Sequence, residues 1–224
     1  MMRIASVIFV LFLMFLMACT SGPAVQQLES KNGFAVIGAP RPGEQLATFA
    51  GGCFWALQEG MIELKGVHKV ISGYSGGTTA NPDYAKVMSK TAGHAEAVQV
   101  YYDPKIISFE QLCEAFFHAH DPTQVDGQGP DLGTEYRSIA FFRSPEEYRT
   151  IRRVIDRLEA TKYRNIPVVT ELIPFKIIYP AEMEHQDYYK RNLWDSYIRK
   201  ISRPKVMKLR REMPEFIKTE YLKT

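Results

Sequence analysis

The stretch Gly51-Gly52-Cys53-Phe54-Trp55 decides the fold prediction and marks the chemistry of this chain. It lies between an apolar strand predicted over Leu46–Ala50 and a helix predicted over Phe54–Leu64. The two glycines permit a tight turn between this strand and this helix. A thiol at a helix start meets unpaired N–H groups and the positive end of the helix dipole, which favour the thiolate. These five residues alone leave a reactive nucleophile and an inert buried cysteine equally open.

The N-terminus, residues 1–19, is typical of an export signal. Arg3 precedes an apolar run over residues 4–17 that is short for a membrane span. The following Leu16-Met17-Ala18-Cys19 resembles a bacterial lipoprotein cleavage box, so we expect lipidation at Cys19. A plain signal or an uncleaved anchor is the alternative. The prediction is a lipoprotein anchored to a membrane of the bacterial cell envelope and facing the periplasm or the exterior.

The rest of the chain is predicted to contain one folded domain. Residues 20–45 are rich in Ser, Gly, Pro and Gln and predict a flexible tether, residues 46–203 the catalytic domain, and residues 204–224 a basic C-terminal extension. The net charge of +3 is too small to indicate a nucleic-acid partner. The basic residues between Arg199 and Arg211 predict a solvated helix face, with contact to anionic lipid as the alternative. We expect a monomer.

Strand and helix signals interleave irregularly along this domain. Strands are predicted over 67–74, 95–102, 138–142, 168–172 and 176–179, and helices over 108–120 and 144–163. The predicted fold class is α+β: a two-layer sandwich with a central mixed, ferredoxin-like sheet flanked by helices and long loops.

The cysteines and histidines point away from metal chemistry. Cys113 borders an apolar stripe of the helix predicted over 108–120, which indicates a packing role and leaves Cys53 without an obvious partner. The five histidines are scattered, and the chain has no Cys-x-x-Cys motif, so no metal site is predicted. No Gly-x-Gly-x-x-Gly motif follows a strand, which argues against a bound nicotinamide.

Polar residues at strand edges and in loops supply the other candidate groups. Glu96 enters an apolar strand, where burial would raise its pKa and keep it a proton donor at neutral pH. Tyr84 and Tyr136 offer uncharged hydroxyl donors. A thiolate, a neutral acid and phenols together suit attack on a polar centre whose oxygen must leave. Taken singly, Glu96 on an alternating strand is expected rather to face water, the two tyrosines are also consistent with ordinary packing, and Asp131 with a turn.

Five motifs together resemble the A-type peptide methionine sulfoxide reductases, and the resemblance runs from about Leu46 to Pro204. In chain order they are Gly52-Cys53-Phe54-Trp55, Asn81-Pro82-Asp83-Tyr84, Gly93-His94-Ala95-Glu96, His120-Asp121-Pro122-Thr123 and Gly133-Thr134-Glu135-Tyr136-Arg137-Ser138. The resemblance implies reduction of the S epimer of methionine sulfoxide, free or in proteins, with no bound metal or flavin.

The resemblance also implies a role for each group at the site. Cys53 would attack the sulfoxide sulfur, Glu96 would protonate the oxygen, and Tyr84 and Tyr136 would hydrogen-bond it. The Cys53 product would be a sulfenic acid, which is reversible.

The remaining site residues implied by the resemblance surround the substrate. Phe54 and Trp55 would enclose the S-methyl group, and Asp131 would order the pocket by hydrogen bonds. His185 and Tyr188 resemble a family segment that lines the site.

Two departures from the family pattern affect the predicted mechanism. Glu135 stands where the family commonly has Gln, which adds a negative charge that would disfavour the thiolate. The C-terminal region carries no cysteine to resolve the sulfenic acid, so we expect an external thiol or a thioredoxin-like protein as reductant, with Cys113 as the weaker candidate. The alternatives in other classes are a thiol peroxidase that uses Cys53 and an anchored, non-catalytic peptide-binding module.

Overall fold

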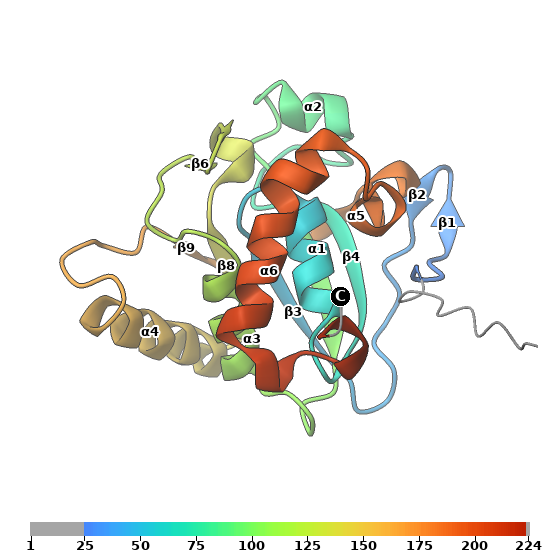
Figure 1. Ribbon diagram of the computed structural model, residues 1–224. Coiled ribbons are helices and arrows are strands. Elements are labelled where there is room, and N and C mark those ends of the chain that lie inside the picture. Colours follow the sequence, from blue (N-terminus) through green and yellow to red (C-terminus); the bar gives the residue numbers. More distant parts are fainter. Residues whose placement is uncertain (1–24, 223–224) are drawn as a thin grey trace, which may run out of the picture.

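The computed structural model describes residues 25–222. Its centre is a six-stranded mixed sheet (Figure 1) with the spatial order β10-β4-β5-β3-β8-β9. The strands are β3 (Gln45–Ala50), β4 (Val67–Ser75), β5 (Ala95–Tyr102), β8 (Ile139–Phe142), β9 (Glu171–Pro174) and β10 (Ile178–Pro180). Only the β8–β9 pair is parallel within the described sheet.

The helices follow the strands in an irregular order. They are α1 (Phe54–Ile62), α2 (Tyr84–Met88), α3 (Phe109–Ala119), α4 (Pro145–Ala160), α5 (Tyr188–Arg191) and α6 (Arg203–Glu212). Short helical turns are η1 (Thr134–Tyr136), η2 (Met183–His185), η3 (Ile198–Ser202), η4 (Pro214–Phe216) and η5 (Thr219–Tyr221). Two small hairpins pair β1 (Ser30–Lys31) with β2 (Phe34–Ala35), and β6 (Gly127–Gln128) with β7 (Asp131–Leu132).

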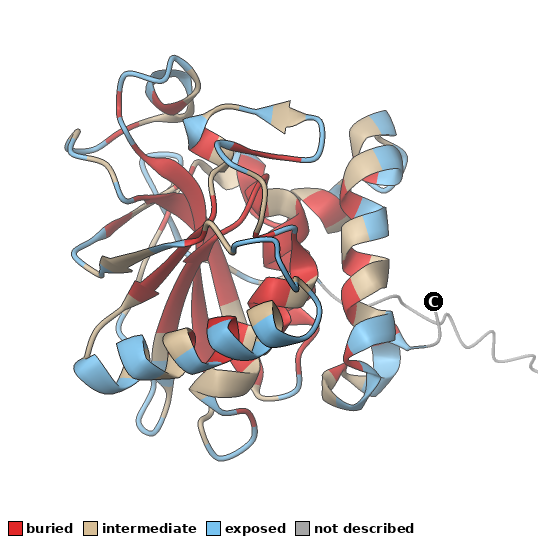
Figure 2. Ribbon diagram, turned by 90° about the vertical axis from the view of Figure 1, so that its left-hand side faces the viewer, coloured by how far each residue is buried: buried red, intermediate tan, exposed pale blue. Residues whose placement is uncertain are grey.

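The sheet is covered on both faces. Helices α1, α3, α4 and α6 pack together over one face, where Phe49, Phe54 and Phe116 belong to the main apolar cluster. Every residue of the central strand β5 is buried, and Figure 2 shows the buried residues concentrated in the sheet and the inner sides of the helices. Because both faces are covered, water is excluded from the side chains of the central strands.

The prediction of an α+β fold around a mixed sheet is confirmed. Each strand and helix predicted by residue range has a counterpart within a few residues, and the range of β5 is the predicted one. The Ser108 side chain accepts from the Gln111 N–H, while the Gln111 side chain accepts from the Ser108 N–H, which completes the capping box of α3. Ser144 caps α4, with Pro145 in its first turn.

The described part of the predicted tether, residues 25–45, is folded against the domain. Leu28 and Ile37 pack beside Ile71 and Tyr101 on the sheet face opposite the helices, and Ala35 of the β1–β2 hairpin is buried there. The tether prediction is therefore wrong for this segment. Its few apolar side chains cover a face of the sheet that would otherwise be exposed to water.

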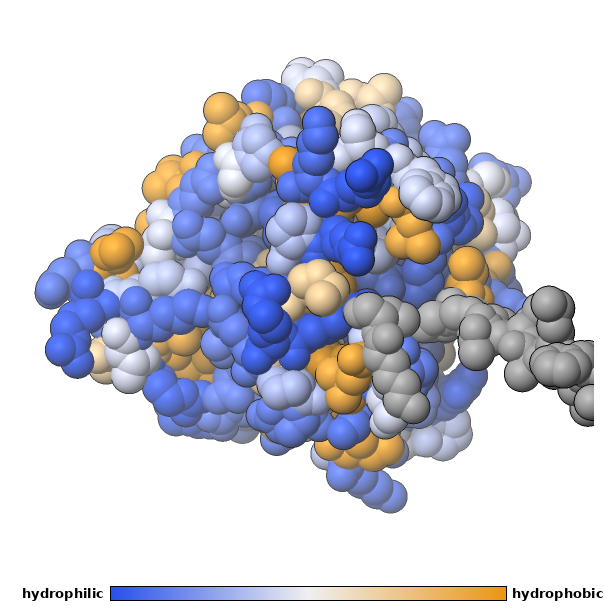
Figure 3. Space-filling model, in the orientation of Figure 1, coloured by the Kyte–Doolittle hydropathy of each residue, from blue (hydrophilic) through white to orange (hydrophobic). Residues whose placement is uncertain are grey.

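The predicted C-terminal extension is also part of the domain. Val206 and Leu209, three positions apart on α6, are buried against the other helices. Ile217 is buried and forms a β-bridge with Leu64. The outer face over α6 is mostly hydrophilic (Figure 3), so the predicted solvated face is one side of an amphipathic helix.

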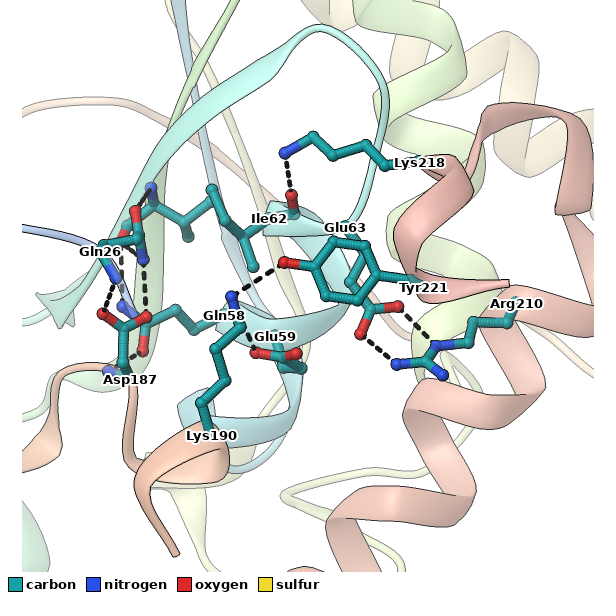
Figure 4. Close-up of polar contacts among 11 residues, drawn as sticks. Gln26, Gln58, Glu59, Ile62, Glu63, Asp187, Lys190, Arg210, Lys218 and Tyr221 are labelled. Carbon is teal, nitrogen blue, oxygen red and sulfur yellow. Dashed lines mark hydrogen bonds and ion pairs between the residues drawn. The ribbon is translucent and has the colours of Figure 1, made fainter. Parts of the chain in front are cut away.

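Polar contacts fasten both terminal segments to α1 and α5 (Figure 4). The Gln26 backbone and side-chain N–H groups donate to Asp187 at 3.0 and 2.8 Å. Arg210 donates to both carboxylate oxygens of Glu63 at 2.7 Å, and Glu63 is 0% exposed. Lys218 Nζ donates to the Ile62 carbonyl at 2.5 Å. The Arg210 and Lys218 contacts fix the C-terminal end of α1, whose N-terminal end carries Cys53.

Cys19 and the predicted signal lie outside the described residues. Across residues 25–222, the structure contains no helix with the length and apolar character needed to span a bilayer.

Removing one partner of the Glu63–Arg210 pair tests this role of the C-terminal segment. Arg210→Met is expected to lower the free energy of unfolding by about 3–5 kcal/mol, because it leaves a buried carboxylate unpaired. The measurement is urea unfolding followed by circular dichroism. Arg211→Met on the exposed side of α6 is the control, and Glu63→Met combined with Arg210→Met should recover most of the loss. Equal stability of Arg210→Met and Arg211→Met would contradict a structural role for α6.

Candidate active site

The turn between β3 and α1 places Cys53 at the start of the helix. Gly52 has φ +82°, and a Cβ there would lie 2.5 Å from Gln128 Cγ, so only glycine fits. The Gly52 N–H donates to the Tyr136 carbonyl at 3.1 Å. Cys53 is the N-cap residue of α1 and is 6% exposed. The predicted turn chemistry therefore holds the sulfur at the junction of β3, α1 and η1.

Glu96 of β5 faces this helix start from the neighbouring part of the sheet. The Phe54 N–H donates to Glu96 Oε2 at 2.8 Å, which places the carboxyl group against the residue that follows Cys53. Burial raises the pKa of Glu96 to about 8, and the Phe54 N–H only partly opposes this. Glu96 is 2% exposed, so it does not face water. The prediction of a carboxyl group that is neutral at pH 7 agrees with this raised pKa.

The thiol itself differs from the prediction. Burial, followed by the charge of Glu96, raises the pKa of Cys53 well above its usual value. The Trp55 N–H and the Tyr197 hydroxyl act in the opposite direction but do not prevail. The predicted low-pKa thiolate is therefore wrong for the site without substrate. One of the helix N–H groups expected to serve the sulfur, that of Phe54, is taken by Glu96.

Tyr84 and Tyr136 are partly buried and pack against the apolar cluster that contains Cys53. Burial and the charge of Glu96 raise the pKa of Tyr84 to about 12, and the same two causes raise the pKa of Tyr136. Cys53 also contributes to both shifts. The Tyr136 hydroxyl contacts Met88 Sδ at 3.5 Å. Both phenols keep their hydrogens at neutral pH and can donate them.

Aromatic rings form the wall predicted beside the thiol. Trp55 stacks on Tyr188 with ring centroids 3.8 Å apart, and Phe54 lies fully buried behind it. The centroid of the His185 ring lies 4.5 Å from that of Tyr84 and 5.4 Å from that of Phe54. Burial lowers the pKa of His185, so its ring is neutral at pH 7. The structure thus brings together all four residues predicted to line the substrate site.

Asp131 connects the site to two residues that the sequence did not indicate. Its Oδ2 accepts a hydrogen bond from the Tyr197 hydroxyl at 2.6 Å and lies 3.6 Å from Lys205 Nζ. Asp131 therefore orders the pocket across the chain, as the family resemblance implied, and does not serve only its own turn. Tyr197 also packs edge-on against Trp55 at 5.7 Å. No local motif marks Tyr197 or Lys205, because tertiary packing alone brings them to Cys53.

Glu135 is a buried residue of η1 with a lysine nearby. It is 4% exposed, and Lys90 Nζ is 3.9 Å from its Oε1. Its charge contributes to the raised pKa values of Glu96 and Tyr84. The expected effect of Glu135 on the thiolate stays a prediction.

Cys113 has the environment expected of a packing residue. It is 0% exposed in α3, and burial raises the pKa of its thiol. Both described cysteines are free thiols. Within residues 25–222, no group of three or more His, Cys, Asp or Glu side chains is arranged to hold a metal ion.

Comparison with known proteins identifies the family of this chain. The sequence model of the peptide methionine sulfoxide reductase family matches residues 45–216. The chain belongs to this family. The match continues through α6 to Phe216, which agrees with the position of α6 inside the folded domain.

Individual relatives give the same result. The peptide methionine sulfoxide reductase MsrA of Deinococcus radiodurans is 46% identical over 171 residues, 76% of this chain and 83% of that protein. The peptide methionine sulfoxide reductase MsrA 1 of Rhodopirellula baltica is 44% identical over 178 residues, covering 80% of this chain and 92% of that protein. The structure of methionine sulfoxide reductase A of Corynebacterium diphtheriae superposes with a TM-score of 0.64 at 30% identity, over 78% of this chain and 88% of that one.

Proposed function

We propose that this protein reduces the S epimer of methionine sulfoxide to methionine, both free and in proteins, and so repairs oxidised proteins. One observation carries the proposal. The Cys53 thiol and the buried carboxyl group of Glu96 lie at the same helix start, and burial raises the pKa of Glu96 to about 8. Membership of the family supports the substrate.

The site supplies one surface for each part of the sulfoxide. The S-methyl group packs against the Phe54 and Trp55 rings. The sulfoxide oxygen accepts hydrogen bonds from Glu96, Tyr84 and Tyr136, which hold their hydrogens at neutral pH because burial raises their pKa values. The sulfur of the substrate then faces Cys53.

The substrate generates its own nucleophile in this scheme. A sulfoxide oxygen that accepts from Glu96 stabilises the neutral form of that carboxyl group, so Glu96 stays uncharged while Cys53 ionises. The partial positive charge on the sulfoxide sulfur also favours a nearby thiolate. The nucleophile therefore forms when the electrophile is in place, which fits a thiol whose pKa is high in the empty site.

The reaction balances as a two-electron transfer. The Cys53 sulfur bonds to the sulfoxide sulfur while the oxygen takes one proton from Glu96 and one from the Cys53 thiol, so that the S–O bond breaks and water leaves. A water molecule then attacks the Cys53 sulfur, which breaks the bond between the two sulfur atoms, releases methionine and returns a proton to Glu96. Net, the sulfoxide and the Cys53 thiol become methionine and the Cys53 sulfenic acid. Two external thiols return Cys53 to the thiol, with release of water and formation of their disulfide. The protein needs no bound cofactor, and a thioredoxin-like protein or a small thiol supplies the two electrons.

Turnover of the separated S and R epimers with dithiothreitol tests the function. Methionine is expected from the S epimer alone, and Cys53→Ser should abolish it. Glu96→Gln keeps a side chain of the same shape but cannot transfer the proton, so kcat/KM should fall about 10²–10⁴-fold. Glu146→Gln on the exposed side of α4 is the matched control. Reduction of the R epimer, or full activity of Glu96→Gln, would refute this scheme.

A single-cysteine cycle with an external reductant is proposed because both described cysteines are buried free thiols and no cysteine follows Cys113 in the chain. After one turnover without reductant, the intact mass is expected to increase by one oxygen, located on the Cys53 peptide. Cys113→Ser should behave the same way. A Cys53–Cys113 disulfide in the wild-type protein would overturn the scheme.

Lipid anchoring at Cys19 in the cell envelope is proposed from the sequence pattern of residues 1–19. Cys19→Ser is expected to move the protein from the membrane fraction to the soluble fraction of cells. Retention of this variant in the membrane fraction would exclude a lipid on Cys19 as the anchor.

A further inference from the structure

Lys205 brings a buried amino group to the active site. The side chain comes from the first turn of α6 and is 17% exposed, while its Nζ atom is shielded from solvent and has no hydrogen-bond acceptor among the described residues. Its nearest carboxylate oxygen is Asp131 Oδ2, at 3.6 Å. A Cβ on Gly52 would also lie 3.6 Å from Nζ, so the amino group adjoins the residue before Cys53. A buried amino group without an acceptor is unfavourable unless its charge serves a neighbour.

The neighbour is Asp131, which connects Lys205 to Tyr197 and through it to the surroundings of the Cys53 sulfur. The Tyr197 hydroxyl donates to Asp131 Oδ2, the same oxygen that Lys205 faces. The Tyr197 ring packs edge-on against Trp55, two residues after Cys53, with ring centroids 5.7 Å apart, and the Tyr197 hydroxyl lowers the pKa of the Cys53 thiol. Burial and the nearby negative groups raise the pKa of Tyr197, so the hydroxyl keeps its hydrogen. A phenol has one hydrogen, and Asp131 and an ionised Cys53 compete for it.

A positive charge beside Asp131 changes the outcome of that competition. Lys205 attracts the electron density of Asp131 Oδ2 and weakens its hold on the Tyr197 hydrogen. It also offsets the repulsion between Asp131 and a thiolate, because Asp131 is one of the charges that raise the pKa of Cys53. The same carboxylate raises the pKa of Glu96.

We propose that Lys205 is a positioning residue of this site: by pairing with Asp131, it leaves the hydroxyl hydrogen of Tyr197 available to the sulfur of Cys53. Lys205 touches neither the sulfur nor the carboxyl group of Glu96 in this role. It acts through Asp131 and Tyr197 on the thiolate that attacks and on the sulfenic acid that follows.

Other charged and titratable groups face the same region and are common to all variants below. Glu96 comes from β5, Glu135 from η1 with Lys90 beside it, and His120 from the end of α3. Lys205 contributes to the lowered pKa of His120, which is about 4, so that ring is neutral in the pH range of the test.

The test is the pH profile of Cys53 alkylation by iodoacetamide, followed by mass spectrometry of the Cys53 peptide in the full chain. Lys205→Met should shift the profile to higher pH and slow alkylation about tenfold at a fixed pH below the midpoint, since one pKa unit is a tenfold change in thiolate. Lys205→Arg keeps the charge and should stay within about twofold of wild type on the same scale. Lys200→Met, which removes an exposed lysine of η3, is the control and should leave the profile unchanged.

Asp131→Asn separates this role from a general loss of positive charge. The amide still accepts from Tyr197 but carries no charge, so this variant should shift the profile to lower pH. In the Asp131→Asn background, Lys205→Met should have no further effect. A shift of equal size in both backgrounds, or no shift from Lys205→Met alone, would overturn the proposal. Asp131→Asn keeps it falsifiable even if Lys205→Met does not fold.

The inference rests on the proposed role of Cys53 as the nucleophile. Alkylation needs no sulfoxide, so its outcome is independent of turnover. An altered alkylation profile without sulfoxide reduction would refute the proposed function and leave the contact chain intact.

Discussion

One hydrogen bond, from the Phe54 N–H to Glu96 Oε2 at 2.8 Å, organises this active site. It joins the start of α1 to the central strand β5 and thereby sets the thiol beside its proton donor. It also gives a helix N–H to the carboxyl group instead of the sulfur. The consequence is a resting site that holds a neutral thiol and a neutral acid, both kept so chiefly by burial. Reactivity then depends on the substrate.

This arrangement requires that α1 stay in place, and the ends of the chain contribute to that. The Glu63–Arg210 pair and the Lys218–Ile62 contact hold its C-terminal half from α6 and the last helical turns. The segment over residues 25–38 covers the opposite face of the sheet. The sequence predicted a flexible tether and a basic extension for these two segments, yet α6 also carries Lys205 to the catalytic centre. Helix α6 therefore contributes both to the stability of the fold, through Arg210, and to the electrostatics of the site, through Lys205.

The predictable parts of the site are those encoded locally. A strand, two glycines and a helix specify where Cys53 sits, and an acidic residue that opens an apolar strand specifies Glu96. Tyr197 and Lys205 were not predicted because the tertiary path of the chain from α5 into α6 brings them to the site, and no local pattern encodes that path. The sign of the Cys53 pKa shift was mispredicted for a related reason. The helix dipole is visible in sequence, whereas the extent of burial and the competitor for the N–H group are not.

The protonation state of Glu96 tests this account most directly. The infrared difference spectrum between the wild type and Glu96→Gln should show the carbonyl band of a protonated carboxyl group at neutral pH. Because the pKa of Glu96 is raised to about 8, the group is neutral below that pH, and the band should disappear only as the pH rises through it. A spectrum that shows an ionised carboxylate at neutral pH would contradict the account.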